Sequence, residues 1–219
     1  MNILIIHVHP EPKSFTSALK EVAVEHFQSR GDIVKVKDLF QMNFNPIASV
    51  NDFKSLSNPV YFSVMKEQMS ASKTDNFSDD LKQEMDDLVW ADFVLFNFPL
   101  WWSSVPAILK GWFDRVMALG FSYHPREKLY ETGVFRNKKA MCCITTGGSQ
   151  EAYSTGGANG NIEEVLYHLT HGILYYNGMQ VLPSFYSWKA HLVDKPTLEH
   201  YLEDYKKHLQ NLENFKALY

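Results

Sequence analysis

Short apolar runs alternate along this chain with stretches in which apolar residues recur every three or four positions. The runs are short, rich in branched residues and bounded by polar or glycine-containing segments, which is typical of strands. They lie at residues 3–8, 33–37, 93–96, 140–144 and 179–182. Because strands and helices alternate, the pattern predicts a parallel sheet with helices on both faces.

Five stretches with helical spacing separate and follow these strands. The first predicted helix ends at Gly31, the second begins at Asp79 and the third begins near Pro106. The fourth covers about 162–175, and the last carries the apolar stripe from Leu198 to Leu212. Right-handed crossovers then favour an α/β, doubly wound, flavodoxin-like sheet of five parallel strands in the order 2-1-3-4-5. We expect a single domain over residues 1–219.

One segment, at about residues 38–76, fits neither period and is called the excursion below. It combines Asn, Pro and Ser clusters with short apolar pieces. A segment of this length without secondary structure is uncommon in a domain, so we expect it to be functional or to pack across a partner.

Composition narrows the class of protein. The 219 residues are 45% hydrophobic and 14% aromatic, which is enough for a sizeable core. The net charge of −4 argues against nucleic acid as a partner, and no apolar run is long enough to insert into a membrane. The only cysteines, Cys142 and Cys143, are adjacent within a predicted strand, so we expect core thiols in a reducing cytoplasm.

Three unusual loops follow the first, third and fourth strands, and in this topology they converge on one crevice. After the first strand, Lys13, Ser14 and Thr16 stand at a helix start, where backbone N–H groups, hydroxyls and a cation suit a phosphate. Ser14 or Thr16 as an ordinary helix cap is the alternative interpretation.

The loop after the third strand is apolar where loops are normally polar. It carries Pro99, Leu100, Trp101, Trp102 and Val105, which would suit a flat ligand or, alternatively, plug the core. The loop after the fourth strand carries Thr145, Thr146, Gly147 and Gly148, and consecutive glycines let backbone approach a ligand closely unless they form only a turn.

A phosphate cradle, an apolar slot and a glycine platform together suit a flavin nucleotide. No G-x-G-x-x-G follows the first strand, and the Walker A and G-x-S-x-G patterns are absent. His168 and His171 lie three apart on a predicted helix, but no further ligand is near them in sequence, so a surface or interface role is favoured and no metal site is predicted.

With these features the chain resembles the NAD(P)H:quinone oxidoreductase (DT-diaphorase) family of flavoproteins over nearly its whole length. The resemblance rests on five motifs in the family's order: HPEPKSFTSALKE, MNFNPI, FPLWWSSVPAILKGWFDRV, TTGGSQEAYSTGGANG and GILYYNGMQVL. The third and fourth are the specific ones.

The resemblance implies FAD, with FMN less favoured, held by three loops in each subunit of a homodimer. Around the phosphates and adenosine it places His9, Lys13, Ser14, Phe15, Thr16 and Ala18. Around the isoalloxazine it places Pro99, Leu100, Trp101, Trp102, Ser103, Thr145, Thr146, Gly147 and Gly148. Tyr153 matches the family's active-site tyrosine, which contacts the flavin. Phe121 and Tyr123 match a loop that covers the partner subunit's substrate pocket.

Two positions depart from the usual family pattern. Asn159 stands where many members have a histidine proposed for charge relay, although some members carry asparagine. Some relatives bind a structural metal through two histidines four apart and a cysteine, whereas here the residue four positions after His171 is Tyr175, so no metal is expected.

The implied activity is a two-electron transfer of hydride from NAD(P)H to a quinone-like acceptor with ping-pong kinetics. Tyr153 would hydrogen-bond developing negative charge, and Asn159 would orient or polarise. Two alternatives stay open: an FMN-dependent azoreductase or nitroreductase, and a regulatory flavoprotein subunit of a potassium-efflux transporter.

Overall fold

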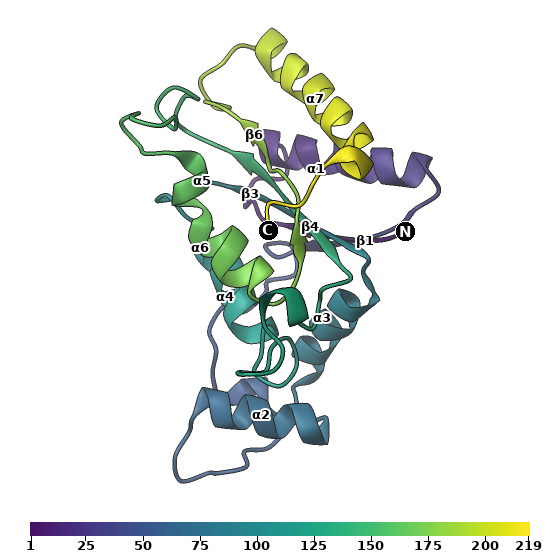
Figure 1. Ribbon diagram of the computed structural model, residues 1–219, viewed down its shortest axis with the longest axis vertical. Helices are drawn as coiled ribbons and strands as arrows, with labels where there is room; N and C mark the ends of the chain where they lie inside the picture. The colour runs from purple at the N-terminus through teal and green to yellow at the C-terminus, as the bar shows by residue number, and fades with distance from the viewer.

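A computed structural model describes the whole chain, residues 1–219, and a twisted parallel sheet runs through its centre (Figure 1). The strand order is β2-β1-β3-β4-β5, as the sequence predicts, with β6 pairing β4 beside β5. The strands are β1 (Asn2–His7), β2 (Ile33–Asp38), β3 (Phe93–Pro99), β4 (Lys139–Thr145), β5 (Gln180–Val181) and β6 (Phe185–Ser187).

The fifth strand position is filled by two short pieces rather than one strand. β5 pairs with the start of β4 and β6 with its end. Pro183 lies between the two pieces and has no N–H to donate to a strand ladder. The sequence predicts the first piece and misses β6.

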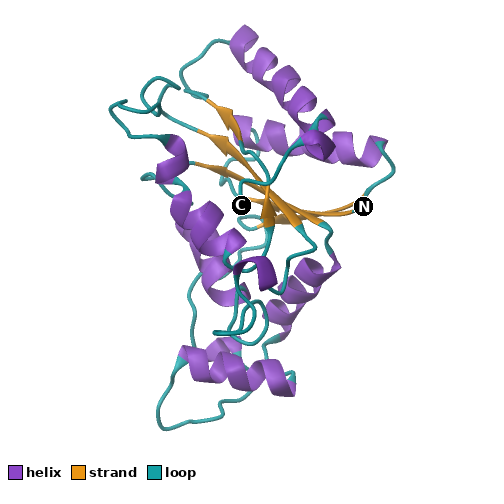
Figure 2. Ribbon diagram, in the orientation of Figure 1, coloured by secondary structure: helices purple, strands orange, loops and turns teal.

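The central strands are buried on both faces, so their alternate side chains build two separate cores. Leu4, Ile6 and Phe96 belong to the larger core, whereas Ile5 and Leu95 belong to the smaller one. Helices cover both faces (Figure 2). α1 and α7 pack on the smaller core, and α3 and α4 on the larger core.

The helices begin where the sequence supplies caps. Ser14 caps α1 by accepting the Ser17 N–H, and Asp194 caps α7 in the same way through Thr197. The helices are α1 (Phe15–Ser29), α2 (Val64–Thr74), α3 (Asp79–Trp90), α4 (Ala107–Val116), α5 (Ile162–Val165), α6 (Tyr167–Leu169) and α7 (Lys195–Gln210). Short 3₁₀ helices are η1 (Val50–Asp52), η2 (Tyr130–Thr132) and η4 (Leu212–Asn214), and η3 (Thr170–Tyr175) is a π-helix.

The helix predicted over 162–175 is broken into α5, α6 and η3. Leu166 separates the first two because its dihedrals, φ −93° and ψ 1°, depart from the helical region. In η3 the Tyr176 N–H donates to the His171 carbonyl, five residues back. Apolar periodicity survives such a change in winding, so the sequence does not reveal it.

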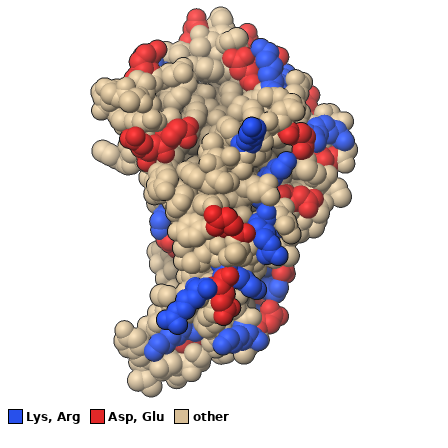
Figure 3. Space-filling model, in the orientation of Figure 1, with Lys and Arg blue, Asp and Glu red and all other residues tan.

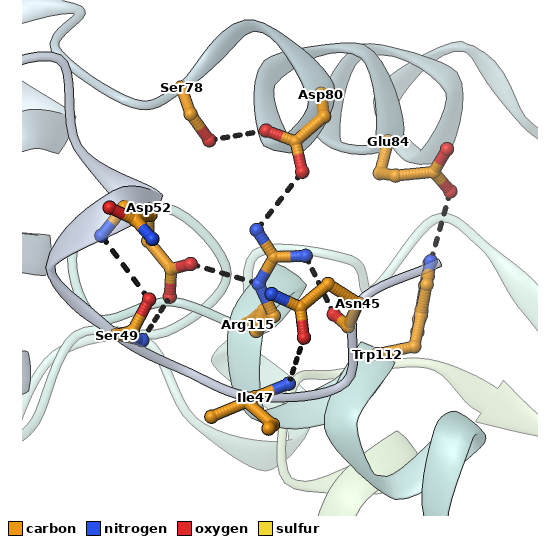
Figure 4. A network of polar contacts seen from close by, with 10 residues as sticks. Asn45, Ile47, Ser49, Asp52, Ser78, Asp80, Glu84, Trp112 and Arg115 are labelled. Atoms are coloured by element: carbon orange, nitrogen blue, oxygen red, sulfur yellow. Dashed lines mark hydrogen bonds and ion pairs between the residues drawn. The ribbon is translucent and has the colours of Figure 1, made fainter. Parts of the chain in front are cut away.

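The sequence shows no strand or helix period in the excursion, but the structure contains η1 and α2 there. A buried arginine of α4 holds it (Figure 4). The Arg115 guanidinium donates to Asp52 in η1 at 2.9 Å, to Asp80 of α3 at 3.0 Å and to the Asn45 carbonyl at 2.8 Å. The excursion also lies directly on α4 where Pro46 faces Gly111, at which an added Cβ would come within 2.1 Å of the Pro46 oxygen.

A second carboxylate organises the rest of the excursion. Glu67 of α2 accepts from the Ser57 N–H at 2.7 Å and from the Asn58 N–H at 3.1 Å. These donors, the Ser57 N–H first, hold the pKa of Glu67 below its ordinary value. Acidic and basic side chains interleave over the lower half of the molecule, and no broad basic surface appears on this face (Figure 3). No helix combines the length and apolarity that crossing a membrane requires.

Candidate active site

An open cleft of about 480 Å³ lies at the carboxyl ends of β1, β3 and β4. This is the edge of the sheet at which parallel α/β folds bind ligands. Its volume falls in the usual range for cofactor sites. The residues that line the cleft are His9, Ser14, Phe15, Thr16, Pro99, Leu100, Trp101, Thr145, Thr146, Gly147, Ala190 and His191.

The turn between β1 and α1 presents hydrogen-bond donors to the cleft. The helix geometry leaves the first-turn N–H groups of Phe15 and Thr16 without intrahelical partners. His9 Nδ1 contacts both backbone groups of Glu11, the N–H at 3.0 Å and the carbonyl oxygen at 3.1 Å, so Nε2 is the ring nitrogen left without a partner in the chain. The turn therefore offers backbone N–H groups and an imidazole nitrogen, a combination suited to a phosphate.

The turn after β3 is a tight hairpin between Trp101 and Ser104, which exchange both backbone hydrogen bonds at 3.0 Å. Its central residues Trp102 and Ser103 have left-handed φ values of 49° and 56°. Such strain in non-glycine residues clusters at functional sites. The Ser104 hydroxyl is anchored to His168 Nε2 of α6 at 3.0 Å. The hairpin turns Trp101 into the cleft and leaves Trp102 fully exposed at its tip.

The turn after β4 forms a backbone platform. The N–H groups of Gly147 and Gly148 have no hydrogen-bond partner within the chain. A Cβ on Gly148 would lie 2.8 Å from the Tyr153 ring and 2.9 Å from the Asn159 amide nitrogen. The absence of a side chain at Gly148 therefore lets Tyr153 and Asn159 sit together against the platform.

Comparison with known proteins places the chain among quinone reductases with a flavodoxin-like fold. A family model described as "flavodoxin-like fold" matches residues 1–209. The rat ribosyldihydronicotinamide dehydrogenase [quinone] is 42% identical over 181 residues, which are 82% of this chain and 78% of the rat protein. NAD(P)H dehydrogenase [quinone] 1 of the guinea pig Cavia porcellus is 40% identical over 217 residues, 99% of this chain and 78% of that protein.

A solved structure gives the same result. A Klebsiella pneumoniae protein assigned as a quinone reductase superposes with a TM-score of 0.95 at 35% identity, covering 100% of this chain and 87% of its own. The chain belongs to the NAD(P)H:quinone oxidoreductase family. The fold and the family resemblance expected from the motifs are thereby confirmed.

Some of the residues that the family resemblance names lie off the cleft lining. Lys13 on the β1–α1 connection and Ala18 in the first turn of α1 do not line it, and neither do Trp102 and Ser103 at the hairpin tip. Gly148, Tyr153 and Asn159 are also outside the lining, and they contact one another next to Gly147, which does line it. Tyr153 also packs 5.9 Å from Trp188, ring centre to ring centre.

Phe121 and Tyr123 do not line the cleft of their own chain. Phe121 packs against Phe135 with ring centroids 5.8 Å apart. Tyr123 packs against Tyr176 and lines a separate groove of about 510 Å³ beside α4. Burial first, and the neighbouring Tyr176 second, raise the pKa of Tyr123. Within a single chain neither residue reaches the cleft.

Sequence reasoning missed a fourth segment of the site, the turn after β6. Ala190 and His191 line the cleft, and the His191 ring is 3.5 Å from where a Cβ of Gly147 would lie. Backbone bonds hold this turn to the platform, from Ala190 to Thr146 at 3.2 Å and from Lys189 to Gly148 at 3.1 Å. Only recognition of β6 as a strand could have predicted its position, because the turn itself has no motif.

The structure does not group the two cysteines or the histidines into a metal site. Burial raises the pKa of the Cys142 thiol to about 12, and that of Cys143 also rises, so both stay protonated. No group of three or more His, Cys, Asp or Glu side chains is placed to share a metal ion. His171 is instead surrounded by tyrosines and stacks on Tyr167 at 4.5 Å.

Proposed function

We propose that the protein binds FAD in the cleft and transfers hydride from NAD(P)H to quinone-like acceptors, two electrons at a time, in a ping-pong cycle. The observation that carries the proposal is the continuity of the cleft from the α1 N-terminus to the glycine platform. One end supplies donors for phosphate, and the other supplies unpaired N–H groups for ring carbonyls. The names of the relatives supply the substrate class.

The residues present fit a bound flavin. Pro99, Leu100 and Trp101 give an apolar wall for a flat ring, and the Gly147 and Gly148 N–H groups face where its polar edge would lie. When bound, the flavin accepts hydride and passes it on. Open apolar surface beside the wall would take the nicotinamide and the acceptor in turn, because both are planar rings.

Tyr153 and Asn159 are proposed to act at the polar edge of the ring. Their side chains share the space over Gly148, so a phenolic O–H and an amide N–H are available next to the platform. Donors aimed at developing negative charge stabilise it. Asn159 is exposed and cannot titrate, so its role would be to orient or polarise, without proton transfer.

The active unit is proposed to be a cytoplasmic homodimer of single-domain chains with sites shared between subunits. Apolar side chains of the excursion stand in solvent: Val60 is 93% exposed, Tyr61 70% and Ile47 67%. The groove that contains Tyr123 runs beside α4, and Phe113, Met117 and Ile173 line it. A second copy would cover these surfaces and bring Phe121 and Tyr123 toward its cleft.

The cofactor proposal is tested by releasing the flavin from purified protein with heat or acid and separating FAD from FMN by chromatography. We expect one FAD per chain, reduced by NADH or NADPH in stopped flow and reoxidised by a quinone. Release of FMN alone would contradict the proposal and favour the azoreductase alternative. Gly148→Ala should lower flavin content because its Cβ displaces Tyr153 or Asn159.

Light scattering tests the dimer. At micromolar concentration we expect twice the chain mass of 25.3 kDa. A monomer with full quinone reductase activity would contradict the shared site. A Tyr123→Ala variant that dimerises should alter the acceptor KM more than flavin content, because Tyr123 does not line the cleft of its own chain.

A further inference from the structure

A buried histidine lies beneath the cleft and belongs to none of the loops that line it. His7 is the last residue of β1, is 1% exposed, and stands opposite Asn97 in the pairing of β1 with β3. Its Nε2 lies 3.2 Å from the Ser17 hydroxyl in the first turn of α1. Burying a polar ring here has a desolvation cost that an apolar residue would avoid, and the hydrogen bond with Ser17 offsets part of it.

The neighbours decide which atom of this contact donates. The Ser17 hydroxyl is 3.1 Å from the Glu11 carbonyl, which can only accept, so Ser17 uses its one proton there. Ser17 Oγ must therefore accept from His7 Nε2–H. Because the Ser17 proton goes to Glu11, the Ser14 hydroxyl must donate to Ser17 Oγ at 3.0 Å, while Ser14 Oγ accepts the Ser17 N–H as the helix cap.

The Ser17 hydroxyl is consequently the point at which β1, the helix cap and the Glu11 turn meet. The turn continues outward through Glu11, whose N–H and carbonyl oxygen lie 3.0 Å and 3.1 Å from His9 Nδ1, so that His9 Nε2 is left to the cleft. A change at His7 is thereby transmitted to Ser14 and His9, the two polar side chains that this turn contributes to the cleft.

We propose that His7 is a positioning residue for the anion-binding turn, holding Ser17, and through it Ser14 and His9, in the arrangement that receives the phosphates of the cofactor. The inference rests on the proposed flavin site. Burial lowers the pKa of His7 to about 4, and the charged groups that face it are Asp38, Lys20, His9 and Glu21. The ring is therefore neutral near pH 7, which fits a donor that adds no charge beneath the cleft.

The test compares ligands with and without phosphate. Full-length protein stripped of flavin is titrated with FAD, ADP and riboflavin. His7→Leu should weaken FAD and ADP by about two- to twelve-fold, the effect of one hydrogen bond, and change riboflavin by less than two-fold. Ser17→Ala should reproduce this pattern, and the double variant should add little to either single change.

Two further variants separate positioning from structural support. His7→Gln, whose amide can donate to Ser17, should recover most of the affinity for FAD and ADP. His26→Leu, a matched change at the other end of α1, should leave all three affinities unchanged, because His26 is far along the helix from the cap.

Equal weakening of FAD and riboflavin by His7→Leu would overturn the proposal and leave His7 a structural residue. Unchanged ADP affinity in both His7→Leu and Ser17→Ala would also overturn it. If the wild type bound neither FAD nor riboflavin, the proposed function would fail, while the ADP titration would still decide the role of His7.

Discussion

Two buried polar networks lie on opposite faces of the sheet and differ in their chemistry. On the α3–α4 face, Arg115 and Asp52 are a charged pair, each with a side chain only 3% exposed. On the α1 face, beneath the cleft, the groups are neutral: His7 contacts Ser17, and the Thr16 and Thr145 hydroxyls meet at 2.8 Å. The first network fixes the excursion to the body of the molecule, and the second joins the turns of the cleft.

The difference follows from what each network must tolerate. A buried ion pair is very costly to break, because the remaining charge is left without a partner, so it suits a fixed joint. Neutral hydrogen bonds contribute less each and can be rearranged at smaller cost. A ligand that enters the cleft brings charges of its own, and a neutral layer beneath it does not compete with them.

Removing the charge from the fixed joint should produce the largest effect. Arg115→Met leaves Asp52 buried without its partner and frees the Asn45 carbonyl. We expect the free energy of unfolding to fall by about 3–5 kcal/mol in urea denaturation. Lys110→Met, which removes an exposed pair with Asp114 on the same helix, should cost less than about 1 kcal/mol. Equal losses in the two variants would show that Arg115 is not the anchor.

The two networks should also lose their contributions to the free energy of unfolding at different pH values. The folded-state pKa of His7 falls from 6.5 to about 4, so the unfolded chain binds more protons between these values. The free energy of unfolding should therefore decrease as the pH falls through this window, by up to about 3 kcal/mol from His7. His7→Gln should flatten that part of the pH profile, although His26 and His208, whose pKa values burial also lowers, keep part of the slope.

The charged network responds lower on the pH scale. Burial alone would raise the pKa of Asp80, but hydrogen bonds from Ser78 and Arg115 hold that pKa below its ordinary value of 3.8. Its contribution is present above that value and is lost as the pH falls further. A profile of unfolding against pH that is the same in wild type and His7→Gln would contradict the assignment of the upper window to His7.

The contrast between the networks also explains what the sequence could predict. Strand runs such as 93–96 and the cap at Ser14 follow from local periodicity and turn chemistry, so the strand order and the position of the cleft follow with them. Arg115 carries no such signal. It lies within the amphipathic pattern of α4, and its partners are 63 and 35 residues away in the chain.

Part of the candidate site could not be predicted either, because it also depends on contacts between segments that are distant in the sequence. His7 lies within the apolar run 3–8 and differs from a core residue through its contact with Ser17. His191 reaches the cleft only because β6 is a strand of three residues behind Pro183. Trp101 and Trp102 are neighbours in sequence, and the left-handed hairpin alone decides that one lines the cleft and the other faces solvent.

A smaller effect is expected where the excursion lies on α4 without any charge. Glycine to alanine normally stabilises a helix interior, yet Gly111→Ala would place a Cβ 2.1 Å from the Pro46 oxygen. We expect a loss of about 1–3 kcal/mol, since the excursion must shift from the helix. Gly172→Ala in η3, whose Cβ would meet nothing closer than 4.0 Å, is the matched control and should be neutral or stabilising. Similar losses at both positions would place the cost in the helix itself.

An effect no larger than that of Gly111→Ala should come from the neutral network, at the hydroxyl pair that joins α1 to β4. Thr16 and Thr145 are both buried, and their Oγ1 atoms lie 2.8 Å apart. Thr16→Val or Thr145→Val alone leaves one hydroxyl without its partner and should cost about 1–3 kcal/mol at most. The double variant should recover much of that loss, because two apolar groups of the same shape replace the pair. Arg115→Met combined with Asp52→Leu should recover in the same direction, but from a deeper loss. Urea denaturation of both cycles, with flavin absent, measures the two coupling energies side by side. A Thr16–Thr145 coupling as large as that of Arg115 with Asp52 would remove the distinction between a fixed charged joint and an adjustable neutral one.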